Sequence, residues 1–100
     1  MPDLRESWLQ LVQQVQGRLD VAARQYDIMA AVYSGSYRYY HNLEHVGYCL
    51  RLLTEVEQPL LYRDAMELAI WFHDLVYLPG FPYNEELSSA VAHSFILELT

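Results

Sequence analysis

The sequence predicts an all-α fold, a bundle of about five helices in one domain over residues 1–100. Three observations predict it. Apolar residues recur with a period near 3.6 along most of the chain. No two runs of strand character are available to pair with each other. Hydrophobic residues make up 53% of the sequence, far above the composition of disordered chains, so a modest core can form.

The first two helices are defined by their flanking residues. Asp3 followed by Glu6 is an N-terminal capping signal, and we expect Gly17 to end the first helix. A second helix is expected from about Leu19 to Tyr33, closed by the Ser-Gly-Ser segment 34–36. The residues with helical spacing are Leu4, Trp8, Leu11, Val12 and Val15 in the first, and Val21, Ala22, Tyr26, Met29, Ala30 and Tyr33 in the second.

The aromatic segment 37–40 has strand character but no partner strand, so it is expected to be a connector. A third helix is predicted from Asn42, and Pro59 marks the start of the next element, since proline is favoured in a first helical turn. The apolar stripe of the third helix consists of Val46, Cys49, Leu50, Leu53 and Val56.

The fourth helix is predicted from about Leu60 to Tyr77. Its segment 68–72 is apolar on every side, which is typical of a helix buried in the core. Residues 78–82 form a loop by their Pro and Gly content. Asn84 is then expected to cap a fifth helix that is still running at Thr100.

Charge and composition exclude several classes of function. The net charge is −7 with only 6 Lys and Arg, so no basic stripe exists for a nucleic-acid polymer. A small phosphorylated ligand is still compatible, because a bound metal reverses the local field. The single cysteine, Cys49, allows no internal disulfide. No apolar run approaches the roughly 18 residues that span a bilayer, so we expect a cytoplasmic protein without a membrane partner.

Three of the four histidines fall in two short segments, 40–46 and 71–77. His41 and His45 have the spacing of one helical face, and neutral imidazole is a common ligand of divalent metals. The adjacent pair His73 and Asp74 lies in the most apolar predicted helix, where a carboxylate is costly unless it is paired or binds a cation.

Each of these residues also has a purely structural interpretation. His41 could be a helix-start residue bonded to backbone, and His45 a core histidine with satisfied ring nitrogens. Asp74 could pair with a tyrosine or an arginine such as Arg51 or Arg63.

The same residues resemble the motifs of a known superfamily. A histidine in an early helix followed by a His-Asp doublet on a later apolar helix is similar to the HD superfamily of metal-dependent phosphohydrolases. Within it the chain resembles a bacterial group of predicted HD-type phosphohydrolases, and more distantly the cyclic-nucleotide phosphodiesterases. The matching segments are Tyr33-Ser34, Tyr40 to His45, Ala69 to Asp74 and Asn84 to Ala90.

The resemblance implies a site and a reaction. His45, His73 and Asp74 would bind a divalent ion, with Mn, Fe, Ni, Zn and Mg all compatible. His41 would donate a proton to the leaving oxygen. Glu85 and Glu86 could act as a base or orient a metal water, although acidic residues are favoured in any first helical turn.

The chain departs from the HD pattern in one respect. That pattern needs a further aspartate downstream of the doublet, and no Asp follows Asp74 here. We therefore expect at most three protein ligands, and an HD-like domain that is the N-terminal part of a longer one or that completes its core with another copy.

The predicted function is hydrolysis of a small phosphoester, with nucleotides as the substrate class that the resemblance implies. The alternative is a non-catalytic HD-like module for oligomerisation or for binding a metal or nucleotide. On either hypothesis the apolar faces predict a homo-oligomer.

Overall fold

A computed structural model describes residues 3–36, 38–57 and 62–100 of the chain. The described residues form five α-helices and no strand, so the predicted all-α fold is confirmed. The helices are α1 (Leu4–Gln14), α2 (Leu19–Tyr33), α3 (Leu43–Thr54), α4 (Arg63–Phe72) and α5 (Asn84–Leu99). None of the helices in this described part has the length and apolar character needed to cross a membrane.

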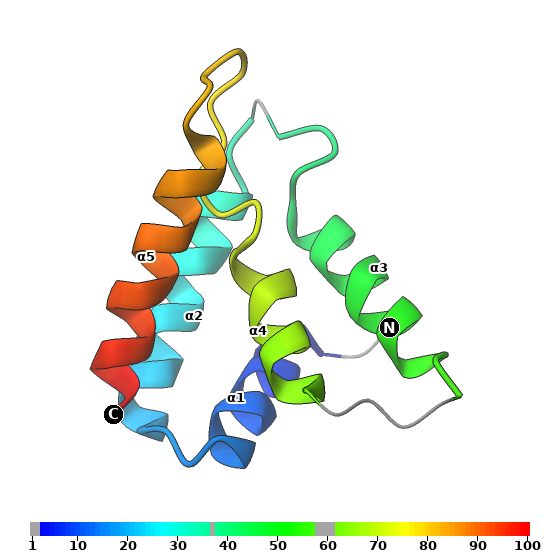
Figure 1. The fold of residues 1–100 in the computed structure, drawn as a ribbon, viewed down its shortest axis with the longest axis vertical. Helices are drawn as coiled ribbons and strands as arrows, with labels where there is room; N and C mark the ends of the chain where they lie inside the picture. The colour runs from blue at the N-terminus through cyan, green and yellow to red at the C-terminus, as the bar shows by residue number, and fades with distance from the viewer. Residues whose placement is uncertain (1–2, 37, 58–61) are drawn as a thin grey trace.

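The helix α4 lies at the centre of the arrangement (Figure 1). It packs against α1, α3 and α5, while α2 packs against α1 and α5. Because α4 is in contact with α3 on one side and α5 on the other, its C-terminal end lies where side chains of both neighbours can reach it.

Aromatic side chains form the core between α1 and α4. Trp8 and Trp71 are both fully buried, and their ring centroids lie 5.4 Å apart in an edge-to-face contact. Phe72 packs edge-to-face on Trp8 at 5.8 Å. The indole nitrogen of Trp8 donates a 3.0 Å hydrogen bond to the carbonyl of Ala22, which also ties α1 to α2. These contacts fix the end of α4 relative to the rest of the bundle.

The ends of α1 only partly follow the prediction. The carboxylate of Asp3 accepts from the backbone N–H groups of Arg5 and Glu6, as expected of a helix cap. The helix then ends at Gln14, and Gln16 rather than Gly17 adopts a positive φ, of 61°. Gly17 is needed for space instead, because an added Cβ would lie 2.8 Å from Cγ1 of Val12.

The helix α3 begins directly after Asn42, close to its predicted start, and Asn42 is its N-cap. The side-chain oxygen of Asn42 accepts the backbone N–H of His45 at 3.1 Å. Val46 and Leu53 are buried as expected, whereas Val56 lies beyond the helix and is exposed. Pro59 lies outside the described residues.

The prediction for α4 was wrong at its C-terminal end. The helix ends at Phe72 and not at Tyr77, and its expected start at Leu60 lies outside the described residues. The cause of the early end is local: the imidazole of His73 bonds to the carbonyl of Ile70, to which the backbone N–H of Asp74 would donate in a continuing helix. Nor is the apolar segment 68–72 buried all round, since Ala69 is exposed and only its last two residues are fully in the core.

Asn84 does not cap α5, contrary to the prediction. It is the first residue of the helix, and its side-chain amide instead accepts from the N–H of Leu78 and donates to the carbonyl of the same residue, at 3.1 and 3.0 Å. One turn later the hydroxyl of Ser88 makes the same two-point contact with the backbone of Val76, at 3.0 and 3.2 Å. The loop after α4 is therefore bound to side chains of α5.

The far end of α5 contacts the turn between α1 and α2. Leu99 is buried, and its carbonyl accepts the backbone N–H of Arg18 at 2.9 Å. Together with the loop contacts, this bond holds α5 at both ends.

Candidate metal centre

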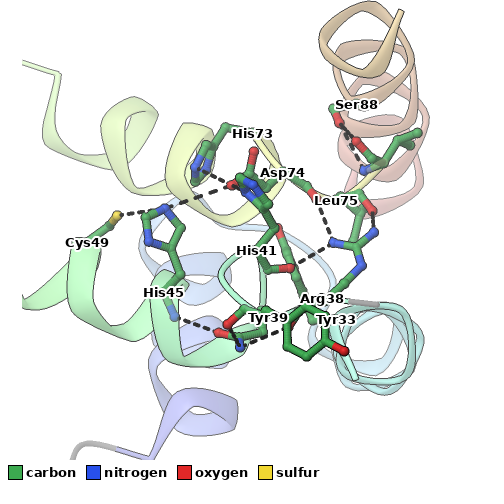
Figure 2. A network of polar contacts seen from close by, with 12 residues as sticks. Tyr33, Arg38, Tyr39, His41, His45, Cys49, His73, Asp74, Leu75 and Ser88 are labelled. Carbon is green, nitrogen blue, oxygen red and sulfur yellow. Dashed lines mark hydrogen bonds and ion pairs between the residues drawn. The ribbon is translucent and has the colours of Figure 1, made fainter. Parts of the chain in front are cut away.

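The three predicted metal ligands come together at the junction of α3 and α4 (Figure 2). His45 is in the first turn of α3, and His73 and Asp74 follow the last residue of α4. One ligand atom from each lies within 4.8 Å of the others. Among the described residues, this is the cluster of ligand-bearing side chains with the geometry to hold a metal ion.

The carboxylate of Asp74 lies at the centre of the cluster. Its Oδ2 atom is 3.2 Å from Nε2 of His73 and 3.8 Å from Nε2 of His45. Two ligand atoms bound to one ion at about 2.0–2.2 Å each lie between 3 and 4 Å apart. The two separations from Asp74 fall in this range, and all three ligand atoms lie within 4.8 Å of one another.

The tautomer of His73 is set by its backbone contact. Its Nδ1 lies 2.7 Å from the carbonyl oxygen of Ile70. A carbonyl can only accept, so Nδ1 carries the proton, and Nε2 of the neutral ring is the nitrogen whose lone pair could bind an ion. The same bond that ends α4 therefore prepares His73 as a ligand.

The cluster is more open to solvent than the sequence suggested. The exposed fraction is 38% for the side chain of His45, 41% for His73 and 21% for Asp74. The apolar neighbours in the sequence had predicted a buried site, but both histidines lie at helix ends and point away from the core. An ion held here would keep coordination positions for water or substrate.

His41 joins the cluster from the connector before α3. Its Nδ1 lies 2.9 Å from Oδ2 of Asp74, and its ring packs on Tyr77 with centroids 4.1 Å apart. Because α3 begins at Leu43, His41 and His45 do not share a helical face, as their spacing had suggested. The described contact of its ring nitrogen is with a carboxylate, whereas the helix-start alternative had a backbone partner.

The alternative partners considered for Asp74 are engaged elsewhere. The guanidinium of Arg51 lies over the ring of Tyr48, and that of Arg63 pairs with Glu67 at 3.1 Å. The described neighbours of the Asp74 carboxylate are the imidazoles of His41, His73 and His45, at 2.9, 3.2 and 3.8 Å.

The two glutamates of the first turn of α5 differ in their positions. Both are exposed. Glu85 lines a hollow of about 380 Å³ between α4 and α5 together with His73 and Asp74, and Glu86 is not among the described residues that line it. The structure thus brings Glu85, but not Glu86, to the side of the predicted ligands.

A buried arginine at the site was missed by the sequence reasoning. The side chain of Arg38 is almost completely buried, and it donates to the carbonyls of His41, Asp74 and Leu75 at 3.1, 2.8 and 2.7 Å. The sequence offered one signal for it: Arg38 is the single cationic residue in the tyrosine-rich segment 37–40.

Two further groups titrate differently because of this environment. The hydroxyl of Tyr33 donates to the carbonyl of Trp71 at 2.6 Å, and burial, followed by the nearby charge of Asp74, raises its pKa far above the ordinary value of 10.0. The thiol of Cys49 lies 3.6 Å from Nε2 of His45, and burial together with the charge of Asp74 raises its pKa. Both groups stay protonated near neutral pH.

The donor set of two imidazole nitrogens and one carboxylate fits a divalent transition ion, in agreement with the ligand types that such ions prefer. Comparison of the chain with protein-family models, with curated proteins and with solved structures finds no match.

Proposed function

We propose that the chain is a metal-dependent phosphohydrolase of the HD type. The observation that carries the proposal is the convergence of His45, His73 and Asp74, whose ligand atoms lie within 4.8 Å of one another. Two independent segments supply them, α3 and the end of α4, in the order that the resemblance to HD phosphohydrolases implies. The orientation of His73 by Ile70 supports a functional role, since histidine ligands are commonly fixed through their other ring nitrogen.

A divalent ion at this position would supply Lewis acidity towards a phosphoryl oxygen and would acidify water at neutral pH. Two nitrogens and one carboxylate are its protein ligands in the proposal. Mn, Fe, Ni, Zn and Mg all remain compatible with this donor set.

His41 is proposed to move the proton that the leaving oxygen requires. Its Nδ1 proton is held by Oδ2 of Asp74 at 2.9 Å, so Nε2 is the nitrogen that can exchange a proton with a substrate. The ring is held in place by Tyr77 on one side. A general acid in this arrangement keeps a fixed direction through the reaction.

Glu85 is the acidic group best placed to assist. It lines the hollow on the α5 side of His73 and Asp74. We propose that Glu85 orients a water for attack, as a base or through a hydrogen bond.

Two hollows are lined by the proposed ligands, one by His45 and the other by His73 and Asp74. The one between α4 and α5 has about 380 Å³, and the other, of about 480 Å³, is lined by His45 together with tyrosines and Arg51. Both have the size of small-molecule sites. A small phosphorylated substrate fits this arrangement, and nucleotides are the class that the resemblance implies.

The proposal is tested by a metal-dependent phosphoester screen that includes an aryl phosphomonoester, an aryl phosphodiester and nucleoside monophosphates. Wild type is compared with Asp74→Ala and with Asp64→Ala, a matched loss of a carboxylate from the first turn of α4. We expect wild type and Asp64→Ala to hydrolyse at least one of these ester classes. Asp74→Ala should have lost that activity. Equal activity in wild type and Asp74→Ala would refute the assigned site.

A non-catalytic oligomerisation module is the second candidate, and one observation favours it. The helix α5 exposes large apolar side chains, with Leu97 at 59% and Leu87 at 42% of their area accessible. Sedimentation velocity of wild type and Leu97→Gln distinguishes this candidate: a dimer that dissociates in the variant, together with no activity in the screen, would favour it.

A further inference from the structure

We propose that Arg38 is a positioning residue with two effects: it sets the contact between His41 and Asp74, and by holding the backbone of Asp74 it sets the affinity of the site for its cation. The inference is based on the proposed metal centre. Arg38 would hold the segment around His41 next to the segment after α4. Neither the sequence motifs nor the geometry of the metal ligands explains how these two segments are held together.

The contacts of Arg38 span the two sides of the site. One guanidinium nitrogen, Nη1, donates both to the carbonyl of His41 and to that of Asp74, at 3.1 and 2.8 Å. The other, Nη2, donates to the carbonyl of Leu75 at 2.7 Å. The backbone of the proton-donating residue and that of the central ligand are thus bound to the same atom (Figure 2).

The environment of Arg38 holds this group rigidly. Its exposed fraction is 5%, and its guanidinium lies over the ring of Tyr33 at 5.2 Å from the centroid. The hydroxyl of Tyr33 is in turn bonded to the carbonyl of Trp71, in the last turn of α4. The carbonyls just beyond a helix C-terminus also attract a cation. Packing and electrostatics therefore favour a planar cation at this position.

A lysine could not replace it in this role. The planar guanidinium presents several N–H donors in a fixed geometry, whereas an ammonium is a compact point charge on a flexible stem. Bridging three carbonyls that belong to two separate segments requires the planar arrangement. Without it, the carbonyls of His41 and Asp74 lose their common donor, and the 2.9 Å side-chain contact between the two residues is no longer fixed.

The magnitude of the expected effect follows from related cases. Removing a residue that orients metal ligands without touching the metal lowers metal affinity by about 10- to 100-fold. Arg38 acts on the backbone of Asp74, the ligand nearest to both histidine nitrogens. We expect a loss within this range.

The experiment uses Arg38→Lys and Arg38→Met, with Gln25→Leu as the matched control. Gln25 is fully buried, and its side-chain amide donates a 2.9 Å bond to the carbonyl of Phe95 between α2 and α5. The control therefore also loses a buried bond from a side chain to a backbone carbonyl. Mn²⁺ affinity measured by calorimetry should fall about 10- to 100-fold in both Arg38 variants and stay within about threefold of wild type in Gln25→Leu.

A second readout needs no metal. The tautomer of neutral His41 is read from long-range proton–nitrogen correlations, with the signals assigned by their loss in His41→Ala. In wild type and Gln25→Leu we expect the Nδ1–H form, held by Asp74. In Arg38→Lys we expect the mixture of tautomers that a free imidazole shows. If Arg38→Lys only lowered the stability of the fold and did not move His41, its His41 would remain in the Nδ1–H form, as in wild type.

The outcomes separate the two proposals. If wild type binds Mn²⁺ and the Arg38 variants bind it as tightly, with the His41 tautomer unchanged, the role of Arg38 is refuted and the metal site stands. If wild type binds no metal but Arg38→Lys loses the Nδ1–H form, the metal site is refuted and the positioning of His41 by Arg38 stands. If Arg38→Met does not fold, Arg38→Lys, which keeps the charge, decides both readouts.

Discussion

The Nδ1 atom of His41 lies 2.9 Å from Oδ2 of Asp74, although the two residues are 33 positions apart in the chain. The same oxygen faces His73 and His45 at 3.2 and 3.8 Å. One carboxylate oxygen therefore faces three imidazoles. In our proposal His45 and His73 bind a cation, and His41 keeps a proton. The predictions below separate these two uses of Asp74.

Metal binding should stabilise the fold through this carboxylate. With free Mn²⁺ or Zn²⁺ at about 100 times the dissociation constant, we expect a gain of about 2.7 kcal/mol in the free energy of unfolding. In a domain of this size each kcal/mol shifts the melting temperature by about 4–8 °C. Asp74→Asn should show no gain, and Asp64→Asn the full gain, in thermal melts with and without metal. An equal shift in Asp74→Asn would contradict the assignment.

Replacing His41 should separate catalysis from metal binding. Because His41 is proposed to carry a proton and not the ion, His41→Ala should keep metal affinity within about tenfold while losing about 10²- to 10⁴-fold in kcat, the usual contribution of a general acid. His45→Ala should lose metal affinity itself. Calorimetry and kinetics at saturating metal provide the two measurements. A His41→Ala variant with undiminished kcat would rule out the proton transfer.

Alkaline pH should destabilise the protein through Tyr33. Its pKa is raised in the folded state by burial and by Asp74, above the ordinary value of 10.0. Near and above pH 10 the unfolded chain releases this proton and the folded chain keeps it, so the stabilisation is complete below that pH and is lost as pH rises. The slope for one proton is about 1.4 kcal/mol per pH unit.

Urea denaturation of wild type and Tyr33→Phe from about pH 8 to 11 tests this linkage. At pH 8 the variant should be less stable by about 1 kcal/mol, because it lacks the bond to Trp71. The difference should shrink as pH rises above 10. A difference that does not change with pH would show that Tyr33 ionises as freely in the folded protein as in the unfolded chain.

Two glycine substitutions should destabilise for different reasons. In Gly17→Ala the new Cβ would lie 2.8 Å from the buried Val12 and 3.3 Å from Leu99, so we expect overpacking to cost about 1–3 kcal/mol. In Gly80→Ala nothing lies within 4 Å, and only the positive φ of 76° opposes the side chain, at a cost of about 1–2 kcal/mol. Reversible denaturation measures both.

A third variant distinguishes the two causes. Val12→Ala should recover part of the loss in Gly17→Ala and none of that in Gly80→Ala, since it removes the clashing methyl groups. Additive losses in the double variant of Gly17 and Val12 would show that the two residues are not in contact.

Sequence reasoning predicted the helices well because each has a local signal. Apolar periodicity predicted the segments, the capping signal at Asp3 is confirmed, and α3 begins close to its predicted start at Asn42. It was wrong where a tertiary contact competes with propensity. The helix α4 ends early because the imidazole of His73 takes the carbonyl of Ile70, and Asn84 binds the loop at Leu78 instead of capping α5.

The candidate site was only partly accessible to sequence reasoning. Motif order predicted that His45, His73 and Asp74 belong together, and the structure brings them within 4.8 Å. The exposure of the site and the burial of Arg38 beside it were not predicted. A cation that binds backbone carbonyls has no sequence pattern for its partners, because every residue has a carbonyl. Only the folded arrangement shows which carbonyls face it.

The hydrogen bonds between α5 and the loop after α4 have a consequence for amide hydrogen exchange. The backbone N–H groups of Val76 and Leu78 are bound by the side chains of Ser88 and Asn84, not by helical carbonyls. These amides can exchange with solvent deuterium only when α5 separates from the loop. Their exchange rates should therefore be similar to each other and to those of the first turns of α5, so that the loop and this helix open as a single cooperative unit beside Asp74.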